Sequence, residues 1–455
     1  MTTIAAISTP NTTGSVAMIR ISGDDAFVIA GKVFHSEQIP VDEMQGYTAA
    51  YGNIQDGDSV IDDGVLLIFR APKSYTGENV AELTCHGGVY VARRVLQACI
   101  NAGAKLAEPG EFTKRAVLNG KMTLTQAESV IDVINSMSEQ YLTCSNAQKS
   151  GALHRKINEI ADKILSVSAH ISAWLDYPEE GLDSFETSSH IGQLTDCRLG
   201  LSLLLKSYEI AAVMREGIVT AIVGKPNAGK STLMNLLTGK QRSIVTDIPG
   251  TTRDIVEQTV HINGAVLRLC DCAGIRDTDD AVEQIGIDYM YRQIEESSLI
   301  IAVFDNARPL EKDDYDLIER IHGKKSICVI NKCDLDSSYD FALLPAKFNH
   351  VVRLCAKDDS GEEKQKLVNV IGKVCDINAL DLSAGFLANE RQRNCVIEAE
   401  GLLSQAVTLI ESGHSPLDAT GFLLENALDA LYRLSGKSAS AEIIDDVFRN
   451  FCVGK

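Results

Sequence analysis

Long hydrophobic runs are missing from this chain of 455 residues. No apolar stretch approaches the ~20 residues that a membrane-spanning helix needs, and the start, MTTIAAISTP, lacks the basic segment of a secretory signal peptide. Aromatic residues are also scarce, at 5% against a hydrophobic total of 45%, which indicates globular domains packed largely through aliphatic helices. We therefore expect about two to four domains and no membrane association.

Cysteine pairs with the spacing of a zinc site or a disulfide framework are absent as well. The 12 cysteines include no CxxC pair. Cys85, Cys99, Cys144 and Cys395 each stand alone in apolar patterns, where cysteine is typically a small buried hydrophobe. This usage favours a reducing, cytoplasmic location.

Positive charge is in deficit, with 43 Lys and Arg against 62 Asp and Glu and a formal net charge of −19. A non-specific nucleic-acid binder needs a basic surface, so the composition argues against that class. An acidic protein can still carry a local RNA-binding patch. The candidates are KRAVLNGK at 114–121 and RQR at 391–393, and the alternative for each is a solvated helix face.

The chain does contain a complete phosphate-binding loop, GKPNAGKS at 224–231. Gly224 and Gly229 let backbone N–H groups approach the phosphates, Lys230 reaches the β and γ oxygens, and the Ser231 hydroxyl is placed to bind Mg²⁺. A buried-strand pattern precedes the loop and a helical pattern follows it. The loop is therefore expected at a helix N-terminus, where the dipole favours anions.

Two further motifs complete the signature of a guanine-nucleotide site. DCAG at 271–274 ends a buried strand with Asp271, which would hold magnesium directly or through water, and Gly274 can offer its N–H to the γ-phosphate. In NKCD at 331–334, the Asp334 carboxylate can accept from guanine N1–H and the exocyclic amine, a donor pair that adenine lacks. NKxD alone is a weak signal, but about 60 residues after DxxG and about 100 after the phosphate loop it predicts a GTPase domain.

The region of the catalytic switch departs from the pattern of many signalling GTPases. TDIPGTTRD at 246–254 stands where switch I is expected, and the hydroxyls of Thr251 and Thr252 offer a magnesium ligand. Ile275 follows DCAG in place of a water-orienting glutamine, so hydrolysis must be assisted in another way. Asn227, inside the phosphate loop, offers a carbonyl oxygen; a turn-stabilising amide is the alternative.

Periodicity divides the chain into four segments. Residues 1–118 alternate strand-like and helical pieces, which predicts an α+β domain. Residues 119–212 and 377–455 are helical in period, with the first such pattern running through 124–140, and residues 215–376 alternate strands and helices. We expect a multidomain α+β and α/β protein in which a P-loop GTPase domain, with a Ras-like doubly wound sheet, is inserted into one helical domain.

With these motifs the chain resembles the MnmE (TrmE) family of tRNA-modification GTPases over nearly its whole length. The resemblance rests on GKPNAGKS, TDIPGTTRD, DCAGIRDT and VEQIGI, on the N-terminal stretches MIRISG, YTGENVAELTCHGG and EPGEFTKRAVLNGK, and on the final FCVGK. It implies that residues 1–118 form a tetrahydrofolate-binding-like dimerisation domain, similar to that of the glycine-cleavage aminomethyltransferases, and that the C-terminal motif belongs to the helical domain.

The resemblance implies roles for residues of the nucleotide site. Family contacts to GTP map onto the phosphate loop, switch I, DCAG and the two base-recognition loops, namely Asn227, Ala228, Gly229, Lys230, Ser231, Thr232, Thr246, Asp247, Ile248, Pro249, Gly250, Thr251, Thr252, Asp271, Cys272, Ala273, Gly274, Asn331, Lys332, Asp334, Cys355, Ala356 and Lys357. Potassium, which takes the place of an arginine finger, maps onto Asn227, Thr246, the Ile248 carbonyl and Thr251. Magnesium maps onto Ser231 and Thr252. Glu283 would orient the attacking water through a bridging water; an ordinary first-turn helix carboxylate is its alternative.

Folate contacts of the family map onto Arg20, Glu82 and Lys121, with Lys455 approaching from the C-terminus. A glutamate such as Glu82 can accept from the pterin amino groups, while Arg20 and the lysines can meet anionic parts of the cofactor. A solvated strand edge is the alternative for Arg20.

Two residues near these motifs have open roles, and one loop and two single positions depart from the family pattern. Cys452 is a candidate for chemistry on the one-carbon unit, with a packed terminal thiol as the alternative; His86 is an acid/base candidate with a structural alternative. The glycine-rich family loop is replaced here by residues 11–15, Cys272 replaces the usual Thr, and Cys355 the usual Ser.

The function implied by the resemblance is GTP hydrolysis coupled to modification of the wobble uridine of certain tRNAs at C5. The carbon would come from a 5,10-methylene or 5-formyl tetrahydrofolate, and the product would be an aminomethyl or carboxymethylaminomethyl group. The implied partners are a second copy of the chain and the flavoprotein MnmG (GidA), in a heterotetramer or larger complex. Two alternatives remain: a GTP-dependent assembly or ribosome-binding switch, and a stand-alone folate-dependent methyltransferase gated by GTP.

Overall fold

The computed structural model describes residues 2–176, 187–238, 258–262, 265–270, 291–336, 341, 343–358, 361–375, 382–412, 417–449, 451 and 453–454. The chain forms two compact units. Unit 1 comprises Met1–Ile131, Gln148–Leu201 and Glu390–Lys455, and unit 2 comprises Asp132–Ala147 and Ser202–Asn389. Unit 2 thus interrupts unit 1 in the sequence.

Unit 1 begins with a seven-stranded sheet in the order β3-β4-β5-β6-β2-β1-β7. Its strands are β1 (Ile4–Ile7), β2 (Val16–Ser22), β3 (Phe34–His35), β4 (Thr48–Asp56), β5 (Ser59–Phe69), β6 (Val80–His86) and β7 (Lys105–Leu106). All neighbours are antiparallel except β1 and β7. The α+β fold expected for this region is confirmed.

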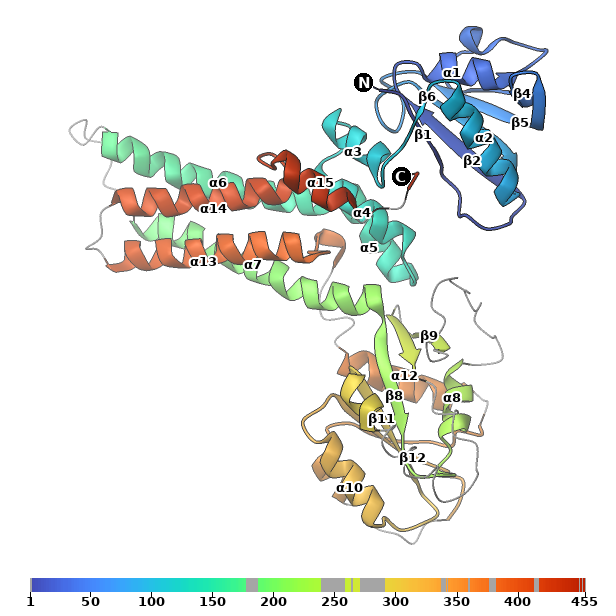
Figure 1. Cartoon of the computed structure of the whole chain (residues 1–455). Coiled ribbons are helices and arrows are strands. Elements are labelled where there is room, and N and C mark those ends of the chain that lie inside the picture. Colours follow the sequence, from blue (N-terminus) through green and yellow to red (C-terminus); the bar gives the residue numbers. More distant parts are fainter. Residues whose placement is uncertain are drawn as a thin grey trace. The chain divides into compact units, whose positions relative to one another are not determined.

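Helices cover one face of this sheet. Helix α1 (Ala26–Val33) and helix α2 (Val89–Asn101) pack on it (Figure 1), and the turn η1 (Val41–Glu43) adds to the same core. Along β2, Ala17, Ile19 and Ile21 are buried in that core, whereas Met18 and Arg20 point to the opposite face because side chains alternate along a strand. These helices cover one face of the sheet. On the opposite face, here called the open face, Val65 and Tyr51 of β5 and β4 are exposed, whereas Ile4 and Ala6 of β1 pack against a small second core that includes Phe112.

The rest of unit 1 is helical. Its elements are α3 (Glu111–Leu118), α4 (Leu124–Ile134), α6 (Ala152–Asp176), α13 (Glu390–Ser412), α14 (Leu417–Ser435), α15 (Ala441–Arg449) and the first part of α7 (Thr187–Glu216). Helix α14 packs on both α6 and α13 (Figure 1). Each presents a buried aliphatic stripe, as in Ile157, Ile160 and Ile164 of α6. No helix in the described part of the chain is long and apolar enough to cross a membrane.

The helical pattern through 124–140 corresponds to two helices rather than one. Helix α4 ends at Ile134, and α5 (Glu139–Lys149) begins after a break. The Ser138 hydroxyl accepts a hydrogen bond from the Tyr141 backbone N–H at 3.2 Å. Such a serine cap starts a new helix, and the hydrophobic period alone does not reveal it.

Unit 2 contains a six-stranded sheet in the order β13-β12-β11-β8-β10-β9. Its elements are β8 (Ile218–Val223), α8 (Lys230–Thr238), β9 (Gln258–Ile262), β10 (Ala265–Leu269), β11 (Leu299–Asp305), α10 (Lys312–Ile321), β12 (Ser326–Asn331), α11 (Leu343–Lys347), β13 (Val351–Arg353), α12 (Glu362–Val374) and η2 (Leu382–Ala384). All pairs are parallel except β9 with β10, so the expected α/β fold is confirmed.

Both faces of this second sheet are buried. Along β11, Ile301 and Val303 belong to one apolar core, and Ile300, Ala302 and Phe304 belong to the core on the other side. A strand buried on both faces reads as a continuous apolar run, which is why the strand patterns here lack alternation. Strand β8 lies between β10 and β11, where the strand order reverses, and ligands of such sheets bind beyond the carboxyl end of that strand.

Candidate functional site

The phosphate loop leaves the carboxyl end of β8 and enters α8, as the sequence predicts. Gly224 and Gly229 both have positive φ angles, +148° and +98°. A Cβ on Gly224 would lie 2.3 Å from the Val303 carbonyl oxygen, and one on Gly229 would lie 2.1 Å from Asn331 Nδ2. Glycine is required at both positions, because a side chain would clash and strain the backbone.

The Lys230 ammonium curls back into this loop. Its Nζ donates to the Gly224 carbonyl at 2.8 Å and to the Lys225 carbonyl at 2.9 Å. Ser231 and Thr232 follow in the first turn of α8, with Ser231 exposed. A cation inside the loop, beside a helix N-terminus, is the arrangement that holds a polyphosphate.

The first base-recognition loop is tied to the phosphate loop through Asn331. Its side chain is 2% exposed; Nδ2 donates to the Ala228 carbonyl at 2.9 Å, and Oδ1 accepts from the Ala356 N–H at 2.9 Å. Asn331 thus joins the phosphate loop to the second base-recognition loop, where Lys357 is exposed. Asp334 is exposed as well, which leaves its carboxylate accessible to a base.

Asn227 has a left-handed backbone with φ +62° and an exposed position in the phosphate loop. This accommodates both of its candidate roles, turn residue and cation ligand. Several predicted site residues lie outside the described residues, namely Thr246, Asp247, Ile248, Pro249, Gly250, Thr251, Thr252, Asp271, Cys272, Ala273, Gly274, Glu283, Cys452 and Lys455.

The predicted folate residues Arg20 and Glu82 lie opposite each other on the open face of the first sheet. They are register partners on β2 and β6, and Arg20 Nε donates to Glu82 Oε1 at 2.8 Å. Because β2 is an interior strand, the alternative of a solvated strand edge for Arg20 is wrong. The Arg20 guanidinium also lies 5.6 Å from the ring centres of Tyr75 and Phe112, close enough for cation–π attraction.

The C-terminal tail reaches the same place. The Gly454 carbonyl accepts from Ser8 Oγ at 3.0 Å and from Arg20 Nη1 at 3.4 Å. Lys121, between α3 and α4, reaches the loop that joins β5 and β6: its Nζ donates to the Pro72 carbonyl at 3.1 Å. The structure thus brings the tail to Arg20, while Lys121 binds the loop that carries Tyr75.

Most cations of the two basic clusters are paired within the fold, while Lys121 and Arg393 are exposed. In 114–121, Lys114 pairs with Asp445 at 2.5 Å, and the buried Arg115 pairs with Glu78 and Glu111. In 391–393, Arg391 donates through Nε and Nη2, and Gln392 through Nε2, to the buried carboxylate of Glu128. These side chains stabilise the fold, so no RNA-binding surface is assigned to either cluster.

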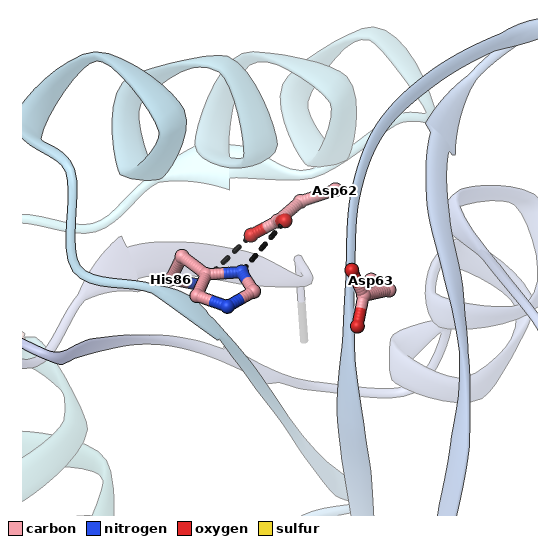
Figure 2. A group of neighbouring side chains, drawn as sticks. All are labelled: Asp62, Asp63 and His86. Atoms are coloured by element: carbon pink, nitrogen blue, oxygen red, sulfur yellow. Dashed lines mark hydrogen bonds and ion pairs between the residues drawn. The ribbon is translucent and has the colours of Figure 1, made fainter.

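His86 lies at the end of β6 beside Asp62 and Asp63 (Figure 2). Its ring Nδ1 lies 2.9 Å from Asp62 Oδ1, and its backbone N–H donates to Asp62 Oδ2 at 2.8 Å. The hydrogen bond with Asp62 raises the pKa of His86. Burial tends to raise the pKa of Asp62, but the hydrogen bonds from His86 outweigh it and lower that pKa. Asp63 accepts from the Tyr51 hydroxyl, so these contacts favour the structural role for His86.

Sequence reasoning missed the residues that surround these motifs. Ser8, Tyr75 and Phe112 contact Arg20 or its partner Gly454, and Asp305 binds Lys332. The signal at Asp305 is a buried apolar run that ends in a carboxylate, the same pattern that singled out DCAG. Aromatic residues beside Arg20 had no such signal, because only the fold brings them together.

Family models cover most of the chain. The model described as GTP-binding protein TrmE N-terminus matches residues 3–121, and the MnmE helical domain matches residues 124–452. The tRNA modification GTPase MnmE of Acetivibrio thermocellus is 39% identical over 458 residues, which cover 100% of this chain and 99% of that protein. The protein of the same name from Clostridioides difficile is 36% identical over 458 residues, with the same coverage.

Among solved structures, the G domain of the T. maritima FeoB iron transporter is 27% identical, covers 34% of this chain and 98% of that chain, and has a TM-score of 0.27. Era in complex with MgGDPNP and a 16S ribosomal RNA segment is 25% identical, covers 41% of this chain and 66% of that one, and also scores 0.27. These TM-scores are too low to support an assignment, and the family follows from the full-length relatives and the phosphate loop. The chain is a GTP hydrolase and belongs to the MnmE (TrmE) family of tRNA modification GTPases.

Proposed function

We propose that this chain couples GTP hydrolysis to modification of the wobble uridine of certain tRNAs at C5, together with the flavoprotein MnmG (GidA). The observation that carries the proposal is the contact between the C-terminal tail and the N-terminal domain, in which the Gly454 carbonyl accepts from Arg20 and Ser8. Gly454 of the family motif FCVGK thus lies beside Arg20, a candidate folate residue, while Cys452 and Lys455 lie outside the described residues. The alternative, a GTP-dependent assembly switch, gives this contact no chemical role.

The residues around Arg20 fit a folate. Glu82 offers a carboxylate that can accept from pterin amino groups, and Arg20 offers a guanidinium for the anionic tail. Both side chains are mostly buried, at 12% and 15% exposed, so a ligand there would exchange their mutual ion pair for charged contacts of its own. When bound, the tetrahydrofolate derivative supplies the one-carbon unit. The partly buried ring of Tyr75 provides an apolar surface at this site, and desolvation raises the pKa of the Tyr75 hydroxyl.

The phosphate loop fits GTP with magnesium, which the family implies. Lys230 can exchange the Gly224 and Lys225 carbonyls for phosphate oxygens without leaving the loop, and Ser231 holds an exposed hydroxyl at the first turn of α8. Bound Mg²⁺ neutralises phosphate charge. Asn227 is the described residue that would hold potassium, whose role would be to supply the positive charge of an arginine finger.

The open face of the first sheet supports homodimerisation. Met18, Thr84, Val65 and Tyr51 form one row across four strands on the face opposite the helices. Val65 and Tyr51 are 40% and 59% exposed. Exposed Val65 and Tyr51 side chains on a face that the helices do not cover favour association with another protein surface, and a second copy of the chain is the occupant we propose.

Mass analysis of wobble nucleosides tests the proposal. In cells that lack the gene, we expect the C5-aminomethyl and carboxymethylaminomethyl uridines to disappear and to return when the wild-type chain is supplied. An assembly switch would leave these nucleosides intact, and that result would overturn the proposal. Modification that persists in cells lacking MnmG would instead favour the stand-alone methyltransferase.

A GTPase assay in potassium and in sodium tests the monovalent ion. With the ion acting in place of an arginine finger, turnover in sodium is expected to fall by about tenfold or more. The Asn227→Ala variant should turn over slowly in both salts, because the ligand is lost. Equal turnover of the wild-type chain in the two salts would remove potassium from the scheme.

A further inference from the structure

Residues 305–308, with the sequence DNAR, form a turn at the carboxyl end of β11. Strand β11 lies between β8, which leads into the phosphate loop, and β12, which leads into the base-recognition loop. The three strands are parallel, and Asp305 is in register with Asn331. The turn therefore leaves the sheet at the same edge as both nucleotide-binding loops. None of the four residues belongs to the motifs found in the sequence.

One side of the turn holds the base-recognition loop. Asp305 Oδ2 accepts from Lys332 Nζ at 2.6 Å. The Asn306 backbone N–H donates to the Asn331 carbonyl at 2.9 Å, and Asn306 Nδ2 donates to the Leu335 carbonyl at 3.0 Å. These three bonds hold the first two residues of the NKCD motif and the residue that follows it.

The other side of the turn holds the phosphate loop. Arg308 Nη2 donates to the Pro226 carbonyl at 3.0 Å. Lys225, the preceding loop residue, donates to Glu311 at 2.7 Å and lies 3.2 Å from Asp314. Glu311 and Asp314 form the capping box of α10, so the loop is bound to a helix start as well as to the turn.

Asp305 is common to both sets of contacts. Its side chain is 8% exposed, and Arg308 Nε lies 3.9 Å from its Oδ2. Its Oδ1 accepts from the Ala307 N–H at 2.9 Å. Burial favours the neutral acid, but the hydrogen bonds from Lys332 and Ala307 outweigh it and lower the pKa of Asp305. The group is therefore ionised near neutral pH and attracts one cation from each side of the nucleotide site.

We infer that Asp305 is a positioning residue of the GTP site, which holds Lys332 for the guanine base and, through Arg308, holds the phosphate loop at a fixed spacing from it. Asp305 itself does not touch the nucleotide. Its contribution is preorganisation: the two loops are ordered before GTP arrives, so less ordering entropy is lost on binding. The inference concerns the GTPase activity alone and is independent of the proposed tRNA chemistry.

The test is nucleotide affinity and turnover of the full-length Asp305→Asn variant. We expect the Kd values for GTP and GDP to rise together by about tenfold, because the loss acts on binding shared by both nucleotides. Turnover at saturating GTP should stay within about threefold of wild type, since the reacting phosphate keeps its own ligands. The Glu319→Gln variant is the matched control: it removes an exposed carboxylate that pairs with Lys347 on the same domain, and its affinities should equal the wild-type values.

A double-mutant cycle with Lys332→Met separates positioning from general stability. In the Lys332→Met background, Asp305→Asn should weaken binding much less than it does alone, because the contact is already gone. An equal, additive loss in both backgrounds would overturn the inference, as would unchanged GTP and GDP affinity in folded Asp305→Asn protein. If the Asp305→Asn variant does not fold, the Arg308→Ala variant replaces it in the test. The Arg308 side chain is 37% exposed, so its removal should leave the fold intact. Nucleotide affinity should then fall with the melting temperature retained, and unchanged affinity would overturn the inference.

Discussion

The two sheets of this protein place their ligand sites differently. The sheet of unit 2 is buried on both faces between two apolar cores, and its candidate site lies beyond the carboxyl ends of β8, β11 and β12. The sheet of unit 1 is covered by helices on one face, and its candidate site lies on the open face around Arg20 and Glu82.

This difference determines what each site is made of. The carboxyl edge of a parallel sheet presents loop backbone and helix starts, so the phosphate-binding part of the nucleotide site consists largely of N–H groups, carbonyls and one lysine, as in the Lys230 contacts. A sheet face presents side chains, so recognition there depends mainly on cross-strand pairs such as Arg20 with Glu82, with the Gly454 carbonyl of the tail beside them. The edge site therefore depends on glycine and the backbone, and the face site on individual charges.

Removal of Lys230 should produce the largest effect at the edge. Lys230→Ala deletes the cation that lies inside the phosphate loop, and we expect GTP turnover to fall by at least about 100-fold. Turnover of GTP by the purified chain is the measurement. Lys312→Ala, which removes an exposed lysine from the start of α10, is the control and should turn over GTP at the wild-type rate. Retention of most activity in Lys230→Ala would refute the assignment of the loop.

Removal of Arg20 should affect tRNA modification at the face site without affecting GTP turnover at the edge site. We expect Arg20→Ala to lower wobble-uridine modification in cells by about tenfold or more, since a charge-assisted contact to the cofactor is lost. GTP turnover should remain near the wild-type value, because the edge site is untouched. Arg93→Ala, on the exposed side of α2, should change neither quantity. Loss of GTP turnover in Arg20→Ala would show that the two sites are not separable in this way.

The same comparison explains how much the sequence predicted. The phosphate loop, its strand and its helix lie within about 20 consecutive residues, so local patterns identified them and the glycines that they need. The partner of Arg20 is 62 residues away in the chain, and Arg308 reaches a carbonyl 82 residues away. Such pairs depend on strand register and sheet order, which no local pattern contains. For the same reason the sequence did not reveal that Lys114, Arg115 and Arg391 of the basic clusters pair with carboxylates that are distant in the chain.

The tail contact offers a smaller test of the face site. Gly454 has φ +96°, and a Cβ there would lie 2.4 Å from the Ile7 carbonyl oxygen. We expect Gly454→Ala to lift the tail from β1 and to lower the free energy of unfolding by about 1–3 kcal/mol, with faster removal of C-terminal residues by carboxypeptidase. Gly401→Ala, in α13 where a Cβ meets nothing within 4 Å, should be neutral or slightly stabilising. Equal carboxypeptidase rates in the two variants would contradict the docking of the tail.

The smallest effect is expected at the far end of the open face, where His86 pairs with Asp62 (Figure 2). Because folding raises the pKa of His86, its stabilising contribution is present below the usual value of about 6.5 and is lost as pH rises through the raised value. Because folding lowers the pKa of Asp62, the contribution of that carboxylate is present above its usual value of about 4 and is lost as pH falls through the lowered one.

The difference in melting temperature between the wild-type chain and His86→Ala should therefore be greatest between about pH 4 and pH 6.5 and should shrink above that range. The exposed His35 on β3 provides the control, since His35→Ala leaves the Asp62 contact intact. A difference for His86→Ala that does not change with pH would mean that the ring stabilises the strand end by packing. The His86–Asp62 pair would then contribute to the structure of the open face and not to its electrostatics. Charged side chains would in that case dominate the open face only around Arg20, and the contrast with the backbone-dominated nucleotide site would be limited to that region.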